Sequence, residues 1–538
     1  MSLFFKKIFA NDTPLSLGKV VASLFSLFLI IIFLSLFSAT DQQTIVPAWE
    51  TTYLHIPLFY FSIFLSFSIL LWTLTKKTLF RIWNFLLPLS FLTILPQIIS
   101  LLVNNDGSVT ITHIVTEPQN ILPTFLKFLY FSSELGITLN TKIIVFLILF
   151  LLSFFIFKNT KSLLRSVLGL LLSYLILFFY SIIPSIVSLP YILSGASESP
   201  TEIYSSTLSH GLISTTRQAL PLSLITTSQQ DFFQSIFMSQ IFWLLVVIQL
   251  FLIFILPNLK YRKAFLENFP LTRIIYWSII SLIGIYISQK NYTSIDFKNI
   301  TTLSSFCVIF LLGVLNTLVA ICINDKEDIG IDRVSNPNRP LAKGTITENE
   351  INKFMLVLVI LIIFGLATMN TTTTFFLIFT QMTYYLYSAR PLRLKRNFIS
   401  SSIIIGLASA SMAMAGFFFT SINQRISVFP VEAIFIIAIS FAILSNMKDI
   451  KDYEGDKQEG IQTMPVFFGL ENSKKIMAFL YSIIFISIPL LTHTPSMLFF
   501  SLLCSLFSTY LFTKKQYREK YIFLVLFFYA GMLFLNSI

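Results

Sequence analysis

The stretch ICINDKEDIGIDRVSNPNRP, residues 321–340, turns from apolar to acidic at Asn324. Three aspartates then follow at intervals of three and four residues: Asp325, Asp328 and Asp332. Residues at these intervals share one face of a helix, so the three carboxylates are expected to form one stripe at the end of an apolar helix. We call these three residues the first acid ladder.

The same spacing returns 124 positions later in NMKDIKDYEGDKQEG, residues 446–460, as Asp449, Asp452 and Asp456. We call these residues the second acid ladder. Eight of the 25 acidic residues fall in the two eight-residue windows that hold the ladders, although only 12% of the chain is charged. A solvated loop face explains one ladder alone equally well, but the repeated spacing argues against that explanation for the pair.

The composition around the ladders is that of a membrane protein. The chain has 538 residues, 55% of them hydrophobic, and a mean hydropathy of +0.81. Soluble domains carry about 25% charged residues, far more than this chain does. Its long apolar runs, many near the ~20 residues of a transmembrane helix, differ from the short alternating strands of a β-barrel. The sequence therefore predicts an all-α polytopic membrane protein.

The apolar runs predict six membrane spans in the first half of the chain and nine in the second. The six lie at about 17–38, 55–75, 82–103, 142–157, 164–194 and 238–257. The nine lie at about 274–290, 298–323, 352–369, 371–388, 398–417, 430–448, 475–492, 494–512 and 520–537. The run 164–194 is over-long and contains Pro184 and Pro190, which indicates a tilted, broken or partly re-entrant segment.

The basic residues indicate the orientation in the membrane. The net charge of +12 fits Lys and Arg gathered in cytoplasmic loops, and it does not indicate a nucleic-acid partner. Alternate loops are basic, as in 390–396, whereas intervening loops such as 368–374 are nearly uncharged. Lys6 and Lys7 precede a first apolar run that is too long for a signal peptide. We expect a multi-pass protein of the cell membrane with its N-terminus and both acid ladders in the cytoplasm.

The charged link 258–273 is the best boundary between two domains. It separates an N-terminal multi-span domain of unknown role, 1–260, from a C-terminal domain, 261–538. Two longer polar loops of the first domain, 104–140 and 195–237, are expected outside the cell. The three cysteines form no CxxC pair, so no disulfide framework or thiolate metal site is predicted. The four histidines are scattered, and a metal cluster of histidines is not expected: His55, His113, His210 and His493.

Two facing carboxylate stripes repel each other unless cations lie between them. Ligands that are all oxygen suit Mg²⁺, which typically takes one or two carboxylates, waters and substrate phosphates. The candidate metal ligands are both ladders and the neighbouring amide: Asn324, Asp325, Asp328, Asp332, Asp449, Asp452 and Asp456. The candidate diphosphate contacts are four basic residues near the ladders: Arg339, Arg390, Lys395 and Lys448. Taken singly, each is explained equally well as an ordinary cytoplasmic charge.

Three segments resemble a known family. NDKEDIGID with NPNRPLAKG (324–344) and KDIKDYEGDKQEGIQTMPV (448–466) are similar to the two aspartate-rich motifs of the UbiA superfamily of intramembrane prenyltransferases. YSARPLRLKR (387–396) resembles the basic segment between those motifs. The resemblance covers about 270–538 and implies a nine-helix bundle, which agrees with the nine spans predicted there. It also implies a central cavity open to lipid, with a diphosphate held under a cytoplasmic cap.

The resemblance implies Mg²⁺-dependent transfer of a prenyl group from a prenyl diphosphate to a lipid or aromatic acceptor. Four aspartates are then expected to be catalytic: Asp328, Asp332, Asp452 and Asp456. The motifs look similar to the branch that prenylates geranylgeranylglyceryl phosphate, with chlorophyll-type or homogentisate and other quinone-precursor prenylation as the alternative. The six extra spans depart from the family and leave the acceptor, the oligomeric state and the role of residues 1–260 open.

Three other classes of protein fit the two ladders less well. A cation transporter needs acids near the bilayer midplane, whereas these lie at helix ends beside basic residues. A phosphatidyl-type alcohol transferase would carry its paired aspartates within one motif, and the chain lacks that pattern. A non-catalytic membrane scaffold would not need two intact ladders. The transporter and the scaffold stay as alternatives.

Overall fold

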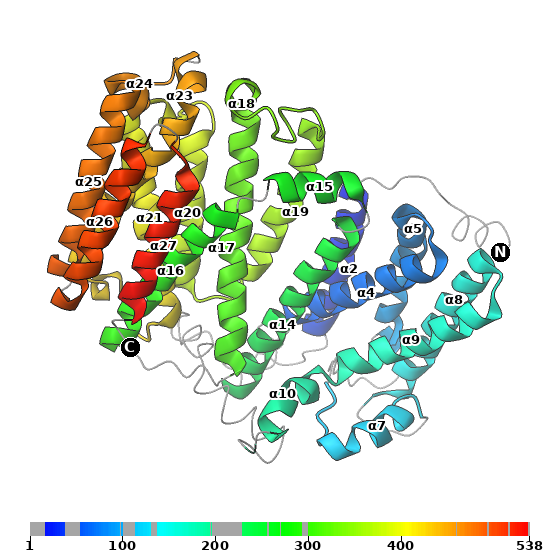
Figure 1. Ribbon diagram of the computed structural model, residues 1–538. Helices are drawn as coiled ribbons and strands as arrows, with labels where there is room; N and C mark the ends of the chain where they lie inside the picture. Colours follow the sequence, from blue (N-terminus) through cyan, green and yellow to red (C-terminus); the bar gives the residue numbers. More distant parts are fainter. Residues whose placement is uncertain are drawn as a thin grey trace. The chain divides into compact units, whose positions relative to one another are not determined.

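The computed structural model describes most of the chain. Described are residues 17–37, 54–96, 98–99, 113–130, 137–193, 195, 229–255, 258–268, 271–292, 300–458, 460–491, 494–514 and 517–535. These residues form helices and connecting turns, with one isolated β-bridge between Asn397 and Gln462 (Figure 1). The chain divides into two compact units. The first comprises Met1–Pro257 and Asp296–Val308, and the second comprises Asn258–Ile295 and Ile309–Ile538.

Helix α4 is the centre of the first unit, where it packs against α14, α9, α5 and α8. The helices of this unit are α2 (Leu17–Phe37), α4 (His55–Thr75), α5 (Leu79–Ser90), α7 (Ile121–Lys127), α8 (Leu139–Thr160), α9 (Leu163–Ser181), α10 (Ile183–Leu193) and α14 (Gln229–Phe254). The predicted run 164–194 forms two helices that meet at Ile182. Pro184 lacks the amide hydrogen that a continuous helix would need there, which explains the break.

Buried polar side chains tie three helices of this unit together. The Gln249 amide of α14 donates hydrogen bonds to Ser66 Oγ of α4, at 2.8 Å, and to Tyr180 Oη of α9, at 2.9 Å. Two histidines that are far apart in the sequence also meet, with 2.8 Å between His55 Nε2 and His113 Nε2. Within the described part of the chain they belong to no group of three metal-ligating side chains. The other two histidines, at 210 and 493, lie outside the described residues.

The second unit holds the predicted nine-span region. Its helices are α15 (Leu259–Asn268), α16 (Leu271–Tyr292), α17 (Ile300–Glu327), which begins in the first unit, α18 (Ile329–Ser335), α19 (Glu348–Leu366), α20 (Thr371–Ser388), α21 (Phe398–Thr420), α22 (Val431–Leu444), α23 (Asp449–Gln458), α24 (Met464–Phe468), α25 (Leu470–Leu491), α26 (Leu498–Thr513) and α27 (Glu519–Leu535). Each of the nine predicted spans coincides with a helix: α16, α17, α19, α20, α21, α22, α25, α26 and α27.

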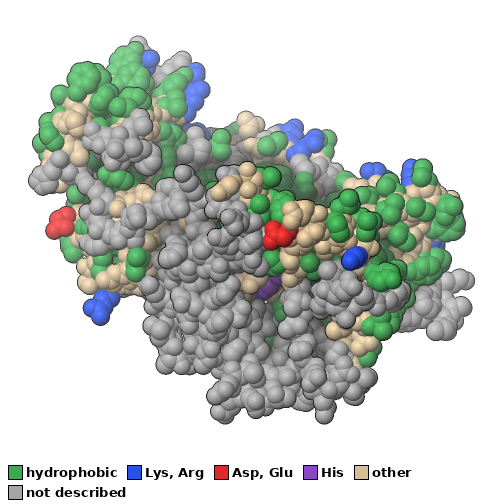
Figure 2. Space-filling model, turned by 90° about the horizontal axis from the view of Figure 1, so that it is seen from below, with side chains coloured by type: hydrophobic (Ala, Val, Ile, Leu, Met, Phe, Trp, Pro, Cys, Tyr) green, Lys and Arg blue, Asp and Glu red, His purple; other side chains and the backbone are tan. Residues whose placement is uncertain are grey.

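Ten of the described helices are long and apolar enough to cross a membrane. They bear exposed large hydrophobic side chains, such as Leu164 of α9 and Leu506 of α26, as a lipid-facing surface requires. On the face drawn in Figure 2, charged side chains are few among the described residues. The prediction of an all-α polytopic membrane protein is confirmed. The predicted span 82–103 is a shorter apolar helix, Leu79–Ile94. The predicted outer loops 104–140 and 195–237 include residues 104–112, 131–136 and 196–228, which lie outside the described residues.

Helix α21 packs most closely within the second unit, against α16, α20 and α22. A Cβ atom added at Gly284 of α16 would lie 1.7 Å from the carbonyl oxygen of Ala413 in α21. A Cβ atom added at Gly416 of α21 would lie 1.9 Å from the carbonyl oxygen of Ser281 in α16. The two backbones therefore touch with no side chain between them, as small residues allow in membrane bundles.

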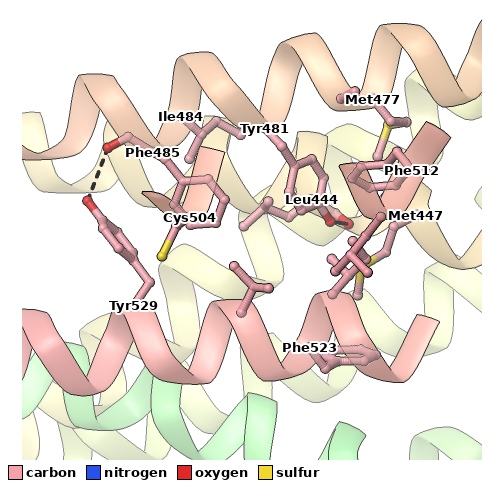
Figure 3. Packing of buried hydrophobic residues seen from close by; sticks show 14 of the residues in the cluster. Leu444, Met447, Met477, Tyr481, Ile484, Phe485, Cys504, Phe512, Phe523 and Tyr529 are labelled. Atoms are coloured by element: carbon pink, nitrogen blue, oxygen red, sulfur yellow. Dashed lines mark hydrogen bonds between the residues drawn. The ribbon is translucent and has the colours of Figure 1, made fainter. Parts of the chain in front are cut away.

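A hydrophobic cluster fixes the start of the second acid ladder. Leu444, Met447 and Ile450, which flank or lie within the segment leading into α23, pack with residues of α25, α26 and α27 (Figure 3). The Tyr481 hydroxyl of α25 donates a 2.8 Å hydrogen bond to the Leu444 carbonyl oxygen at the end of α22. The ladder thus begins from a rigid, well-packed base.

Candidate active site

The first acid ladder lies at the junction of α17 and α18. Helix α17 ends at Glu327 and α18 begins at Ile329. Hydrogen bonds from Asp328 N to Asn324 O (2.9 Å) and from Asp332 N to Asp328 O (2.8 Å) carry the helical register across the junction. The three aspartates therefore stay close along one stripe, and their exposed fractions are only 2–8%.

The second acid ladder lies on one continuous helix, α23, which packs against α18. Both helices lie at the upper end of the second unit in Figure 1. The Asn336 side chain joins the two ladders, because its Nδ2 donates to Asp332 Oδ1 at 3.2 Å and to Asp452 Oδ1 at 3.3 Å. Asp449 and Asp456 are buried on the same helix. Asp332 and Asp452, which are 120 positions apart in the sequence, therefore lie close together.

Basic side chains hold the carboxylates of the first ladder. One nitrogen of Arg339, Nη1, donates to Asp325 Oδ1 at 2.6 Å and to Asp332 Oδ2 at 2.9 Å. Lys395 forms an ion pair with Asp328 and donates to Asn324 Oδ1 at 2.9 Å. Arg339 and Lys395, two of the four predicted diphosphate contacts, thus lie against the acids.

The other two predicted contacts have different neighbours. Arg390 is exposed over 71% of its side chain, and its Nε lies 3.3 Å from an oxygen of Glu327, outside both ladders. Lys448 Nζ donates to the Tyr387 hydroxyl at 2.6 Å and lies 4.5 Å from the centre of that ring. The next residue in the chain is Asp449, the first acid of the second ladder, which is buried.

Arg393 is a further candidate site residue, which no pattern in the sequence indicates. Its Nη2 donates to Asp328 Oδ1 at 2.8 Å and to the Glu327 carbonyl oxygen at 3.1 Å, and only 3% of the residue is exposed. Its φ angle of 40° lies in the left-handed region, which costs a non-glycine residue energy and is often held at functional sites. Among the described residues, its Nε finds no hydrogen-bond partner. The basic run 390–396 was visible, but nothing in it distinguishes Arg393 from ordinary cytoplasmic charge.

Burial disfavours the charged forms of both the acids of the first ladder and their basic partners. The pKa of Asp332 is raised to about 6, chiefly by burial and also by the neighbouring Asp325 and Asp328, while Arg339 opposes the shift. Burial likewise lowers the pKa of Lys395, while the Asp328 carboxylate opposes the shift. The acids and bases thus depend on one another for their charged forms.

The donor set suits a hard divalent cation together with a phosphate. Every candidate metal ligand is a carboxylate or amide oxygen, which fits Mg²⁺. Within the described ranges, no three His, Cys, Asp or Glu residues converge as a ready ligand set. The first ladder is instead occupied by guanidinium and ammonium groups. An anion that draws these cations away can free carboxylate oxygens for a metal, so the residues fit a metal and an anionic ligand bound together.

Comparison with known proteins matches this part of the chain. Residues 278–532 match the UbiA prenyltransferase family. Digeranylgeranylglyceryl phosphate synthase of Methanocaldococcus jannaschii is 30% identical over 208 residues, which cover 38% of this chain and 68% of that protein. Chlorophyll synthase of Oryza sativa is 33% identical over 167 residues, which cover 29% of this chain and 42% of that protein.

Solved structures with a likeness to the chain cover about half of it. One, from a study of digeranylgeranylglyceryl phosphate synthase in membranes, is 25% identical with a TM-score of 0.35, over 51% of this chain and 96% of that one. Another is a UbiA homolog from Archaeoglobus fulgidus bound to DMAPP and Mg²⁺. It is 18% identical with a TM-score of 0.38, over 50% of this chain and 97% of that one.

Proposed function

The chain belongs to the UbiA prenyltransferase family and is an integral membrane prenyltransferase; from that premise we propose that it moves a prenyl group from a prenyl diphosphate to a lipid or aromatic acceptor with the help of Mg²⁺. We assign catalysis to the C-terminal domain, 261–538, and leave the domain 1–260 without a catalytic role. The observation that carries the proposal is the meeting of the two acid ladders beside Arg339, Arg393 and Lys395.

When the diphosphate binds, the basic side chains exchange their carboxylate partners for phosphate oxygens. Phosphate oxygens accept strong hydrogen bonds from Arg and Lys side chains. When Arg339, Arg393 and Lys395 turn to the phosphate oxygens, the carboxylates that they hold are released to bind cations. Mg²⁺ bound by Asn324 and the two ladders would neutralise charge on the diphosphate. The site therefore has complementary groups for both the metal and the anion.

Transfer requires the carbon–oxygen bond between the allylic carbon and the diphosphate to break. The diphosphate leaves with the electron pair of that bond, and the basic residues stabilise its growing negative charge. A nucleophilic oxygen or ring carbon of the acceptor then forms the new bond to the allylic carbon, and the acceptor loses a proton. The burial of the ladders keeps water from these charged groups.

Geranylgeranylglyceryl phosphate is our first candidate for the acceptor, because digeranylgeranylglyceryl phosphate synthases are among the relatives. A chlorophyll-type or quinone-precursor acceptor is the alternative, because chlorophyll synthases are relatives as well. Lipid mass spectrometry with a panel of prenyl diphosphates and acceptors separates these candidates.

Substitution of one aspartate in each ladder tests the proposed activity. We expect Asp328→Ala and Asp452→Ala each to lower turnover of geranylgeranyl diphosphate by at least about 100-fold, because each removes a carboxylate that would hold the Mg²⁺ needed to stabilise the leaving diphosphate. Purified protein is assayed with radiolabelled donor, and removal of metal with EDTA should stop turnover until Mg²⁺ is restored. Glu454→Ala, an exposed acid on the same helix as Asp452, is the matched control. Near wild-type activity in both ladder variants, with normal membrane levels, would end the proposal.

A further inference from the structure

A cavity of about 420 Å³ lies between α17, α19 and α20 in the second unit. Its lining is almost wholly apolar, with side chains such as Val319, Ile362 and Leu377. Ile363 and Met382, also part of the lining, are exposed, so the cavity opens on the lipid-facing side of these helices. The volume falls in the range of small-molecule sites, about 300–1,000 Å³.

Two amide side chains interrupt this apolar lining. Asn316 of α17 is only 4% exposed, and both its Oδ1 and its Nδ2 have no hydrogen-bond partner among the described residues. The Oε1 atom of Gln381 in α20 is likewise buried and unpartnered there. A buried amide without a partner is costly, and within a bilayer there is little water to relieve the cost. Both amides line the same cavity, which indicates a ligand that supplies hydrogen-bond partners to them.

The amides lie at one depth beneath the active site. Asn324 and Ser388 mark the upper ends of α17 and α20, and a 3.3 Å hydrogen bond joins them. Asn316 precedes Asn324 by eight residues and Gln381 precedes Ser388 by seven. At a helical rise of about 1.5 Å per residue, both amides lie about 10–12 Å along their helices from that hydrogen bond. Both amides therefore lie below the acid ladders, while the lining of the cavity also includes Ile323 and Tyr385, close to that hydrogen bond.

The chemistry of the lining selects the class of ligand. None of the described residues that line the cavity is charged, so a phosphate or carboxylate would find no counter-ion there. The chain of a prenyl diphosphate has no polar atom beyond its diphosphate, so a prenyl tail would leave both amides unpaired. A hydroxyl group both donates and accepts, and it can pair with an amide oxygen and an amide N–H at once.

We propose that this cavity binds an uncharged lipid that carries a hydroxyl group. The hydroxyl group donates to Gln381 Oε1 and accepts from Asn316 Nδ2, while the hydrocarbon chain packs on the apolar lining. A free prenyl alcohol and a glycerol monoether share this chemistry, and both are used as probes. The proposal concerns binding, so it stands or falls independently of prenyl transfer.

The test compares an alcohol with its methyl ether, which cannot donate a hydrogen bond. Full-length protein in lipid nanodiscs is titrated with a diazirine-labelled geranylgeraniol, with its methyl ether, and with a diazirine-labelled hexadecylglycerol and its fully methylated ether. We expect wild-type protein to bind at least one alcohol about tenfold or more tightly than the matching ether, the effect of about one buried hydrogen bond. The alcohol that shows the preference identifies the source of the ligand. Equal binding of alcohol and ether for both probes would overturn the proposal.

Substitution of the two amides tests whether they cause the tighter binding of the alcohol. Asn316→Leu and Gln381→Leu should each lower the affinity for the alcohol to that for its methyl ether. Asn159→Leu is the matched control, since Asn159 also has an unpartnered Oδ1 among the described residues but does not line the cavity. Asn316→Leu should also raise the melting temperature of ligand-free protein, because it removes two unpaired polar atoms. If both amide variants still bind the alcohol more tightly than the ether, the assignment to the amides is overturned. It is also overturned if Asn316→Leu lowers the melting temperature and keeps the preference for the alcohol.

Discussion

At the scale of single residues, Asp328 is the carboxylate on which two cations converge. Arg393 and Lys395 both contact it, and all three side chains are largely buried. The single negative charge of Asp328 balances only one of these two positive charges. The contact therefore keeps a net positive charge. A diphosphate carries the negative charge that this pair can accept. Arg393 should therefore act on the substrate, whereas Arg390 a few residues away should not.

A matched pair of arginine variants tests this difference. We expect Arg393→Ala to lower kcat/KM for the prenyl diphosphate by about 100-fold or more, since a buried charge contact to the leaving group is lost. Arg390→Ala should change kcat/KM by less than about threefold, because an exposed ion pair contributes little. Steady-state kinetics with purified variants measures both. Similar losses for the two variants would show that the segment acts as a general positive patch and that the contact of Arg393 has no special role.

A candidate site residue could be predicted from the sequence only where it belongs to a repeated spacing. The repeated spacing of the aspartates is periodic, so the sequence shows it directly. Arg393 makes no pattern, because its role arises from a left-handed backbone and a contact 65 residues away. Asn316 and Gln381 are likewise unremarkable in sequence, because only the packed helices show that their amides lack partners.

At the scale of elements, α21 is the helix around which the second unit is built. Its small residues let α16 and α22 approach so closely that added Cβ atoms would meet backbone carbonyl oxygens. Helices α17 and α19, which line the cavity, approach the backbones of their neighbours less closely than α21 does. The bundle thus packs tightly where α21 meets α16 and α22. At α17 and α19 the helices stand further apart, and side chains and the cavity fill the space between them.

The same substitution should have opposite effects at two glycines. Gly284→Ala places a methyl group against the Ala413 carbonyl, so we expect a loss of stability of about 1–3 kcal/mol or more from overpacking. Gly531→Ala, in α27, adds a methyl group where nothing lies within 4 Å. It should raise stability by up to about 1 kcal/mol through helix propensity. Melting temperatures in detergent measure both, and a neutral Gly284→Ala would contradict the close approach of α16 and α21.

At the scale of the whole molecule, the distribution of Lys and Arg predicts the direction of insertion. The loop after the first ladder carries Arg339 and Lys343, and the loop between α21 and α22 carries only Arg425. By the positive-inside rule we expect the first loop in the cytoplasm and the second loop outside. This expected orientation would place the proposed diphosphate site where prenyl diphosphates made in the cytoplasm can reach it.

Thiol labelling tests the orientation. In a chain whose three native cysteines are replaced by serine, Lys343→Cys and Asn423→Cys each add one exposed thiol. A membrane-impermeant maleimide added to intact cells should label the cysteine at 423 and leave the cysteine at 343 unlabelled until the membrane is opened. The reverse result would place both acid ladders outside and exclude a cytoplasmic donor.

The fold was predictable because long apolar runs leave few choices inside a bilayer. Each of the nine spans predicted for 261–538 coincides with a helix, and the over-long run 164–194 is broken near its first proline. The contact of His55 with His113 was not predictable, because a loop brings together two residues 58 positions apart. Sequence patterns report hydrophobic length well, but they do not report which loop folds back onto which helix.

The seam where Gly284 and Gly416 let two backbones touch has a practical consequence for genetics. In a library scored only by lost product, substitutions there and substitutions in the aspartates would look alike. Protein abundance separates them: glycine variants should disappear from the membrane, whereas aspartate variants should accumulate as intact but silent enzyme. A map of mutational tolerance read without that second measurement would extend the catalytic centre to a seam that only holds the fold together.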